Sequence, residues 1–179
     1  MSEAGWEQVV RDLVTHRGEA LVRYASLVSG SPDDAADLVQ DALVKTFGRL
    51  RNGLSVQSAE AYVRRAIVNA AVDRGRRVTR WRRIRHLAAM VDEQESPAPA
   101  TEVRLDLAEQ LRRLAPRERA CLVLRYYEDL KVDDIAASLG ISSGAVKRYL
   151  SDGLAKLSAA LQDGGVQERN ESIQVRSIP

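Results

Sequence analysis

Cysteine, histidine and aromatic residues are all scarce in this chain of 179 residues. A single cysteine, Cys121, excludes an internal disulfide, and its apolar neighbours predict a core position. With only two histidines beside it, no metal-ligand cluster or nucleophile–base pair can be assembled, and no phosphate-binding glycine loop is present. The sequence therefore predicts a protein that is not an enzyme, with no metal site and no cofactor.

Long apolar runs are missing as well. No stretch approaches the roughly 18 apolar residues of a membrane span. The first ten residues also lack the basic start and apolar run of a signal peptide. We therefore expect a cytoplasmic protein without membrane insertion. With one Phe, two Trp and five Tyr, the core must consist mainly of Ala, Leu and Val, a composition that favours helices over sheet.

One segment, VDEQESPAPATEV, clearly interrupts the helical pattern. Pro97 and Pro99 fix two φ angles, and four acidic residues with almost no apolar side chains leave nothing to bury. This predicts an all-α fold of two small helical domains joined by a flexible acidic linker. The expected division is a first domain at 1–91, the linker at 92–103, a second domain at 104–163 and a disordered tail at 164–179.

Positive charge is concentrated in one block of a nearly neutral chain. Residues 51–91 hold ten arginines and two acids, whereas 1–50 hold eight acids and five bases. Seven of these arginines fall within the twelve positions 74–85, with Trp81 among them. Such a block predicts a localised contact with a polyanion. From charge alone, a solvated helix face is an equally good interpretation.

In the first domain, a helix is predicted to begin at Ser31. Ser31 caps the helix, Pro32 suits its first position, and two aspartates follow. Apolar residues recur at helical spacing, so that one face is buried. Four polar residues remain outside: Asp37, Gln40, Asp41 and Lys45. A loop is expected at 51–58, and a third helix from about Ser58.

This third helix has a buried face and a separate polar stripe. The buried face is predicted to consist of Val63, Ala66, Ile67, Ala70 and Ala71. The stripe consists of Tyr62, Arg65, Asn69, Asp73 and Arg76. An aromatic ring, an amide, a carboxylate and guanidiniums on one face suit stacking on, capping and clamping unpaired bases. A helix surface with ordinary Arg–Asp pairs at i,i+4 spacing explains the same residues.

The second domain carries a more specific pattern, IAASLGISSGAVKRYL. A short helix over 133–139, a turn at Gly140 and a cap at Ser142 or Ser143 predict a helix-turn-helix. An ordinary helical hairpin is the simpler alternative. In a helix-turn-helix, the start of the second helix enters the major groove. The exposed candidates for DNA contact are Ser142, Ser143, Gly144, Lys147, Arg148 and Ser151.

In their order and separation these segments resemble the extracytoplasmic-function sigma factors of the bacterial sigma-70 family, over about residues 5–163. The resemblance is carried by DAADLVQDALVKTF, AYVRRAIVNAAVDRGRR, LAPRERACLVLRYYEDLKVDDIAASLGIS and SGAVKRYLS. It implies a transcription initiation factor that binds core RNA polymerase, directs it to specific promoters and promotes DNA melting. The family also commonly uses an anti-sigma factor as an inhibitor.

The resemblance implies a role for each surface. The helix-turn-helix is expected to read the −35 promoter element and the loop at 51–58 to accept a base flipped from the −10 element, over which Asn69 closes. Polymerase would be contacted through its β′ clamp helices and β flap. The residues implied at the β′ contact are Asp37, Gln40, Asp41 and Lys45, and those at the melted strand are Tyr62, Arg65, Asn69, Asp73, Arg76 and Arg77. Asp152 departs from the family, which often has a basic residue there facing DNA.

Two other functions remain open at this stage. A helix-turn-helix regulator that acts without polymerase is the first alternative, but it has no need of an acidic helix followed by an arginine-rich one. An RNA-binding helical module is the second. It accounts for the arginines and leaves the helix-turn-helix unexplained.

Overall fold

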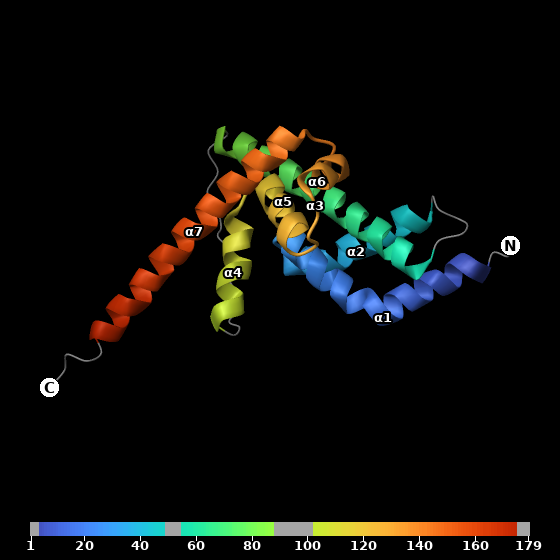
Figure 1. Cartoon of the computed structure of the whole chain (residues 1–179), viewed down its shortest axis with the longest axis horizontal. Helices are drawn as coiled ribbons and strands as arrows, with labels where there is room; N and C mark the ends of the chain where they lie inside the picture. Colours follow the sequence, from blue (N-terminus) through green and yellow to red (C-terminus); the bar gives the residue numbers. More distant parts are fainter. Residues whose placement is uncertain (1–3, 49–54, 88–101, 175–179) are drawn as a thin grey trace.

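The computed structural model describes residues 4–48, 55–87 and 102–174, and helices account for most of them (Figure 1). The helices are α1 (Ala4–Ser29), α2 (Pro32–Phe47), α3 (Val56–Leu87), α4 (Glu102–Arg113), α5 (Pro116–Tyr126), α6 (Val132–Leu139) and α7 (Ser143–Gln174). Since the described residues contain no strand, the prediction of an all-α chain is confirmed. We call α1–α3 the first unit and α4–α7 the second unit.

The first unit is a bundle in which α1, α2 and α3 each pack against the other two. α2 begins where the sequence predicted, because the Ser31 hydroxyl accepts a hydrogen bond from the backbone N–H of Asp34 and Pro32 lies in the first turn. Its expected buried residues face the bundle. Leu38, Ala42 and Phe47 are buried, and Leu43 is half-buried.

α1 supplies the largest side chains of this bundle, although the sequence analysis did not place a helix there. Its large, fully buried side chains are those of Leu13, Leu21, Tyr24 and Val28, and Ala25 is fully buried as well. The helix ends at Ser29 because Gly30 adopts a left-handed φ of 70°, and the Gly30 N–H bonds to the Ser26 carbonyl at 2.9 Å. The chain can then turn directly into α2.

The helix-turn-helix of the second unit is confirmed. Gly140 ends α6 with φ 62° and ψ 41°, in the left-handed region that the turn requires. The Ser142 hydroxyl accepts a hydrogen bond from the Ala145 N–H at 3.2 Å, so Ser142 rather than Ser143 caps α7. The predicted small core is also present. Ile135 and Val146 are fully buried, and Leu139, Ile141 and Leu150 pack against them.

α5 lies at the centre of the second unit. Its start is fixed by Pro116 and by the Glu118 carboxylate, which accepts a hydrogen bond from the Ala115 N–H at 3.2 Å. Cys121 is buried on this helix, as expected for a core residue. Burial raises the pKa of its thiol to about 11.

The structure differs from the expected boundaries near the linker and the tail. α4 already begins at Glu102, whereas the rest of the predicted linker lies outside the described residues. α7 continues to Gln174, so residues 164–174 are helical where a disordered tail was expected. Glutamine, glutamate and arginine in this stretch are good helix formers, and they outweigh the glycine pair.

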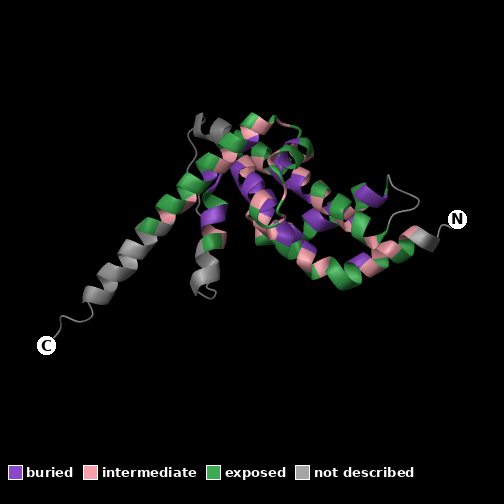
Figure 2. Cartoon of the chain, in the orientation of Figure 1, coloured by how far each residue is buried: buried purple, intermediate pink, exposed green. Residues whose placement is uncertain are grey.

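The two units also contact one another, which the sequence analysis did not predict. One cluster of buried side chains includes Val68 of α3, Leu124 of α5 and Ile135 of α6. Buried stretches of the ribbon, in purple, occur in helices of both units (Figure 2). In addition, α5 packs on α1 and α3, and α6 packs on α3. The main core therefore crosses from the first unit to the second, and a smaller cluster of Leu111, Leu114 and Leu122 lies in the second unit.

The reason lies in two valines that were left out of the predicted buried face of α3. Val63, Ile67 and Ala71 are buried as expected, with Ala66 and Ala70 half-buried. Val68 and Val72 are buried too. They lie on the same helical face as Arg64 and Gly75, both of which contact the second unit. The apolar surface of α3 is thus wide enough to pack on α1 and α2 and also on α5 and α6.

Candidate nucleic-acid interface

The first turns of α7 present a polar surface at the end of the helix-turn-helix. The Ser143 hydroxyl donates to the Asp133 carboxylate at 2.6 Å and so ties the start of α7 to the first turn of α6. The six candidate residues thus lie together on consecutive turns of one helix. Ser142, Gly144, Lys147, Arg148 and Ser151 are exposed, and Ser143 is half-buried.

α5 packs against the side of α7 that lies opposite this polar surface. Lys156 Nζ donates to both carboxylate oxygens of Glu118, at 2.7 and 2.8 Å. Gly153 packs so closely on α5 that a Cβ there would lie 2.8 Å from Leu122 Cδ1. These contacts fix α7 on a rigid support, which is what a reader of DNA requires.

Two guanidiniums flank Tyr149 beside this surface. Arg117 Nη1 donates to the Tyr149 hydroxyl at 3.4 Å, and Arg148 Cζ lies 5.3 Å from the centre of its ring. The hydrogen bond from Arg117 lowers the pKa of Tyr149. Within the described part of the chain neither guanidinium forms an ion pair.

The polar stripe of α3 lies on one continuous helix and faces solvent over most of its length. Tyr62, Arg65, Asp73, Arg76 and Arg77 are exposed, and Asn69 is half-buried. Among the residues that the structure describes, Asp73 pairs with none of these arginines. Internal Arg–Asp pairs therefore do not explain the stripe. Its one hydrogen bond to the second unit runs from Arg65 Nη2 to the Ala137 carbonyl at 3.0 Å.

The arginine-rich block of α3 is only partly neutralised. Arg74 pairs with Asp34 of α2 at 3.1 Å and braces the two helices. Arg76, Arg77 and Arg80 are exposed, as is Trp81, at 64% of its surface. The structure describes Arg82, Arg83 and Arg85 as part of α3 but does not describe their side chains.

A cavity of about 530 Å³ opens between α1 and the start of α3. It is lined by Arg17, Val56, Gln57, Glu60, Ala61 and Arg64. The predicted base-accepting loop is wrong at residues 56–58, which form the first turn of α3, and residues 51–54 lie outside the described residues. Asn69 is absent from the lining. It lies five residues beyond Arg64, the last lining residue along α3, which corresponds to about 8 Å of helix.

The polar face of α2 is exposed and separate from these surfaces. Asp37, Gln40, Asp41 and Lys45 all face solvent. Asp37 and Asp41 stand one turn apart, and Lys45 follows one turn later. None of the four side chains forms a hydrogen bond or ion pair within the described ranges.

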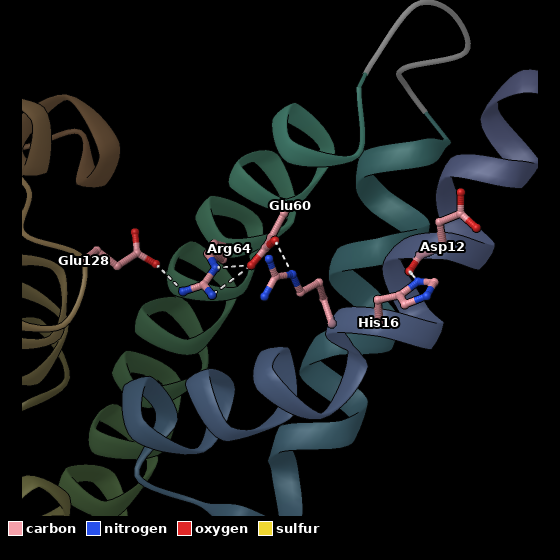
Figure 3. A network of polar contacts seen from close by, with 6 residues as sticks. Asp12, His16, Glu60, Arg64 and Glu128 are labelled. Carbon is pink, nitrogen blue, oxygen red and sulfur yellow. Dashed lines mark hydrogen bonds and ion pairs between the residues drawn. The ribbon is translucent and has the colours of Figure 1, made fainter.

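Sequence analysis missed a polar network that joins α1, α3 and the loop after α5 (Figure 3). Arg64 Nε and Nη2 donate to Glu60 at 3.1 and 2.9 Å, and Arg64 Nη1 donates to Glu128 at 3.1 Å. Arg17 Nε lies 3.5 Å from the second oxygen of Glu60. The Glu60–Arg64 spacing was readable from the sequence. Glu128 was not, since it lies 64 residues away.

Two tyrosines enclose the Arg64 guanidinium. Its Cζ lies 4.9 Å from the ring centre of Tyr24 and 6.0 Å from that of Tyr127. Burial alone would lower the pKa of Arg64, but the hydrogen bonds with Glu60 and Glu128 outweigh it and raise the pKa. Burial, together with the charge of Glu128, raises the pKa of Tyr24.

Arg119 is a second cation that the sequence did not single out. It lies buried on α5 and donates to the carbonyls at the ends of two helices, Val28 and Ser29 of α1 and Leu111 and Arg112 of α4. Helix C-termini carry partial negative charge, which suits a guanidinium. Burial lowers the pKa of Arg119 to about 10, so it stays charged at neutral pH.

Two family models match the chain, Sigma-70 region 2 over residues 13–83 and Sigma-70 region 4 over residues 104–157. The RNA polymerase sigma-E factor of Streptomyces coelicolor is 38% identical over 156 residues, which cover 84% of each chain. The chain belongs to the sigma-70 family. Region 2 falls within the first unit and region 4 within the second, so the sigma-factor resemblance is confirmed.

Other relatives agree with this assignment. The ECF RNA polymerase sigma factor SigL of Mycobacterium tuberculosis is 29% identical over 166 residues, covering 88% of this chain and 92% of SigL. In fold, the chain is similar to the sigma factor RpoE of Bartonella quintana, solved in complex with the anti-sigma factor NepR. The TM-score is 0.61 at 22% identity, over 86% of this chain and 96% of that one.

The sigma-70 family consists of non-catalytic transcription initiation factors. In 4–48, 55–87 and 102–174, no group of three or more His, Cys, Asp or Glu side chains could hold a metal ion. A search of the described helices for one long and apolar enough to cross a membrane also finds none.

Proposed function

We propose that the chain binds core RNA polymerase and directs it to specific promoters, where region 2 holds the melted −10 strand and region 4 reads the −35 element. The observation that carries this proposal is that one chain presents two exposed polar surfaces of different kinds. Tyr62 and Asn69 on α3 suit unpaired bases, whose faces and edges a duplex hides. The exposed start of α7, with Lys147 and Arg148, suits a major groove.

Polymerase has to hold these two surfaces at the right separation. We assign docking on the β′ clamp helices to the exposed α2 face with Asp37, Gln40, Asp41 and Lys45, and docking on the β flap to region 4. Two modest DNA contacts on one chain gain affinity through effective concentration. Capture of unpaired bases offsets an unstacking cost of a few kcal/mol.

The cavity at the start of α3 is the site that we assign to a base flipped from the −10 element. Val56 and Gln57, which line it, fall in the segment predicted as the base-accepting loop and form the first turn of α3 in the structure. Because Asn69 does not line the cavity, it contacts a different part of the melted strand in this proposal. The stripe and the cavity together then follow several nucleotides.

The proposal extends to compartment, chemistry and regulation. We infer that the chain acts in the cytoplasm and has no catalytic activity of its own, since polymerase supplies the chemistry. An anti-sigma factor that covers the polymerase- and DNA-facing surfaces is the regulatory partner that family membership supports.

Run-off transcription with purified core RNA polymerase tests the proposal. Added chain should produce promoter-specific transcripts that core polymerase alone does not make. Asp41→Lys reverses a charge on the proposed docking face and should abolish most of this activity, whereas Glu19→Lys reverses an exposed charge on α1 and should not. Equal promoter binding with and without polymerase, and no added transcription, would overturn the proposal in favour of a polymerase-independent regulator.

A further inference from the structure

Asp152 of α7 is an exposed carboxylate one turn beyond the candidate DNA contact Arg148. Residues four apart lie above one another on a helix, so Gly144, Arg148 and Asp152 form one row. The helix from Gly144 to Asp152 spans about 12 Å, which is about the width of the major groove. Asp152 therefore lies at the edge of the surface that we assign to the −35 element.

Two cations stand where they could neutralise Asp152, and both are engaged elsewhere. Arg148 precedes it by four residues, a spacing at which Arg–Asp pairs form on a helix. The Arg148 guanidinium lies instead over Tyr149, with its Cζ 5.3 Å from the ring centre. Lys156 follows by four residues, but its Nζ donates to both carboxylate oxygens of Glu118, at 2.7 and 2.8 Å. Within the described ranges the Asp152 carboxylate therefore has no partner.

An unpaired carboxylate in the major groove discriminates strongly between bases. Guanine presents the acceptors N7 and O6 there, and thymine presents the acceptor O4, so both repel a carboxylate. Adenine presents the N6 amino group beside the acceptor N7, so one carboxylate oxygen would face a repelling nitrogen. Cytosine presents the N4 amino group as a donor without an acceptor beside it. Cytosine is therefore the base that a carboxylate at this edge selects.

A short side chain reaches a base edge only if the helix backbone comes close to the DNA. The neighbours of Asp152 on the exposed face permit this approach, because Ser142, Gly144 and Ser151 are all small. At Gly144 the nearest atom to an added Cβ would be Ser142 Oγ, 4.0 Å away, so the surface is open there. The start of α7 can therefore enter the groove deeply enough for an aspartate to contact a base.

We propose that Asp152 accepts a hydrogen bond from the N4 amino group of a cytosine and so fixes the base at one position of the −35 element. This inference deepens the proposed function and rests on it, because α7 must lie in the major groove. The unpaired carboxylate lowers affinity for every sequence that lacks a donor at this position. Asp152 thus contributes specificity, whereas Lys147 and Arg148 contribute positive charge.

Promoter selection from a library with a randomised −35 region tests the proposal, with the full chain bound to core RNA polymerase. The parent should enrich cytosine over guanine about tenfold at one position, which corresponds to about 1.4 kcal/mol. Asp152→Asn should move the preference at that position to adenine, because an amide contacts N6 and N7 together. Asp152→Arg should move it to guanine, through N7 and O6. Since Asp152 is exposed, both variants should fold.

Asp129→Asn is the matched control. It removes an exposed carboxylate from the loop between α5 and α6, and asparagine tolerates the φ of 52° at this position. The selected sequences should be those of the parent. If Asp152→Asn and Asp152→Arg raised binding equally on all sequences and left the base preference unchanged, Asp152 would face a phosphate instead, and the proposal would be overturned.

The outcomes separate the role of Asp152 from the proposed function. A polymerase complex that selects promoters, but with the same base preferences in the parent and in both Asp152 variants, would overturn the cytosine contact alone. A complex that selects no sequence and makes no promoter-specific transcript would sink the proposed function, and the role of Asp152 with it. A change of preference confined to one position supports both.

Discussion

Arg119 shows how a single side chain can replace several helix caps. Its guanidinium is buried and pairs with no carboxylate among the described residues, and the acceptors that it meets there are backbone carbonyls at helix ends. Gly30 permits this approach, because a Cβ there would lie 2.5 Å from Arg119 Nη1. Without the guanidinium, the carbonyls of Val28 and Ser29 at the end of α1 would lose this donor, whereas the Leu111 carbonyl of α4 would still accept from the Leu114 N–H.

Arg119→Met should therefore lower the free energy of unfolding by about 2–4 kcal/mol, since methionine fills the space but donates no hydrogen bond. Urea denaturation followed by circular dichroism measures this. Arg112→Met, at an exposed position on α4, serves as the control and should stay within about 0.5 kcal/mol of the parent. A loss of less than 1 kcal/mol for Arg119→Met would mean that water satisfies these carbonyls instead.

Among the helices, those with local signals were the ones that the sequence predicted. Ser31 and Ser142 cap their helices through hydrogen bonds within three residues, and Gly140 ends α6 through its own φ angle. Each of these signals can be read in a window of a few residues. The helical end of the chain, up to Gln174, was missed because a glycine pair was given more weight than the good helix formers around it.

Gly140→Ala tests the turn between α6 and α7. No atom lies within 4 Å of an added Cβ, so the whole cost comes from the φ of 62°. We expect a loss of about 1 kcal/mol in the free energy of unfolding. Gly144→Ala, inside α7 and also free of close contacts, should be neutral or stabilising by up to about 1 kcal/mol. Thermal unfolding of both variants measures these changes in stability. An equal response would show that backbone strain at position 140 is not what sets the turn.

In the complete chain, the contact between the two units is what the sequence could not show. Helical periodicity identified most of the buried face of α3, but it does not say which element covers each part of that face. Val68 and Val72 were therefore left unassigned, and the Arg64–Glu128 pair joins residues 64 positions apart. Such contacts follow from the packing of whole helices, which no short window of sequence contains.

For the candidate sites too, the sequence predicted which residues lie on the surface but not which residues they contact. The exposed residues of α2, α3 and α7 face solvent as their spacing implied. Their roles at polymerase, melted strand and duplex stay predictions. The spacing of residues in the sequence could not predict two contacts of these surfaces. Arg65 donates a hydrogen bond to the Ala137 carbonyl, and Arg148 lies over the Tyr149 ring, before any DNA is present.

The division of labour between region 2 and region 4 is the central claim, and permanganate footprinting of promoter complexes with polymerase tests it most directly. Asn69→Ala should leave duplex binding within about threefold of the parent but lose most of the permanganate-reactive thymines, because its amide is assigned to unpaired DNA. Lys147→Ala combined with Arg148→Ala should weaken promoter binding by about tenfold to a hundredfold, as expected for lost groove contacts. Normal reactivity with Asn69→Ala, or unchanged promoter binding with the double variant, would contradict the account.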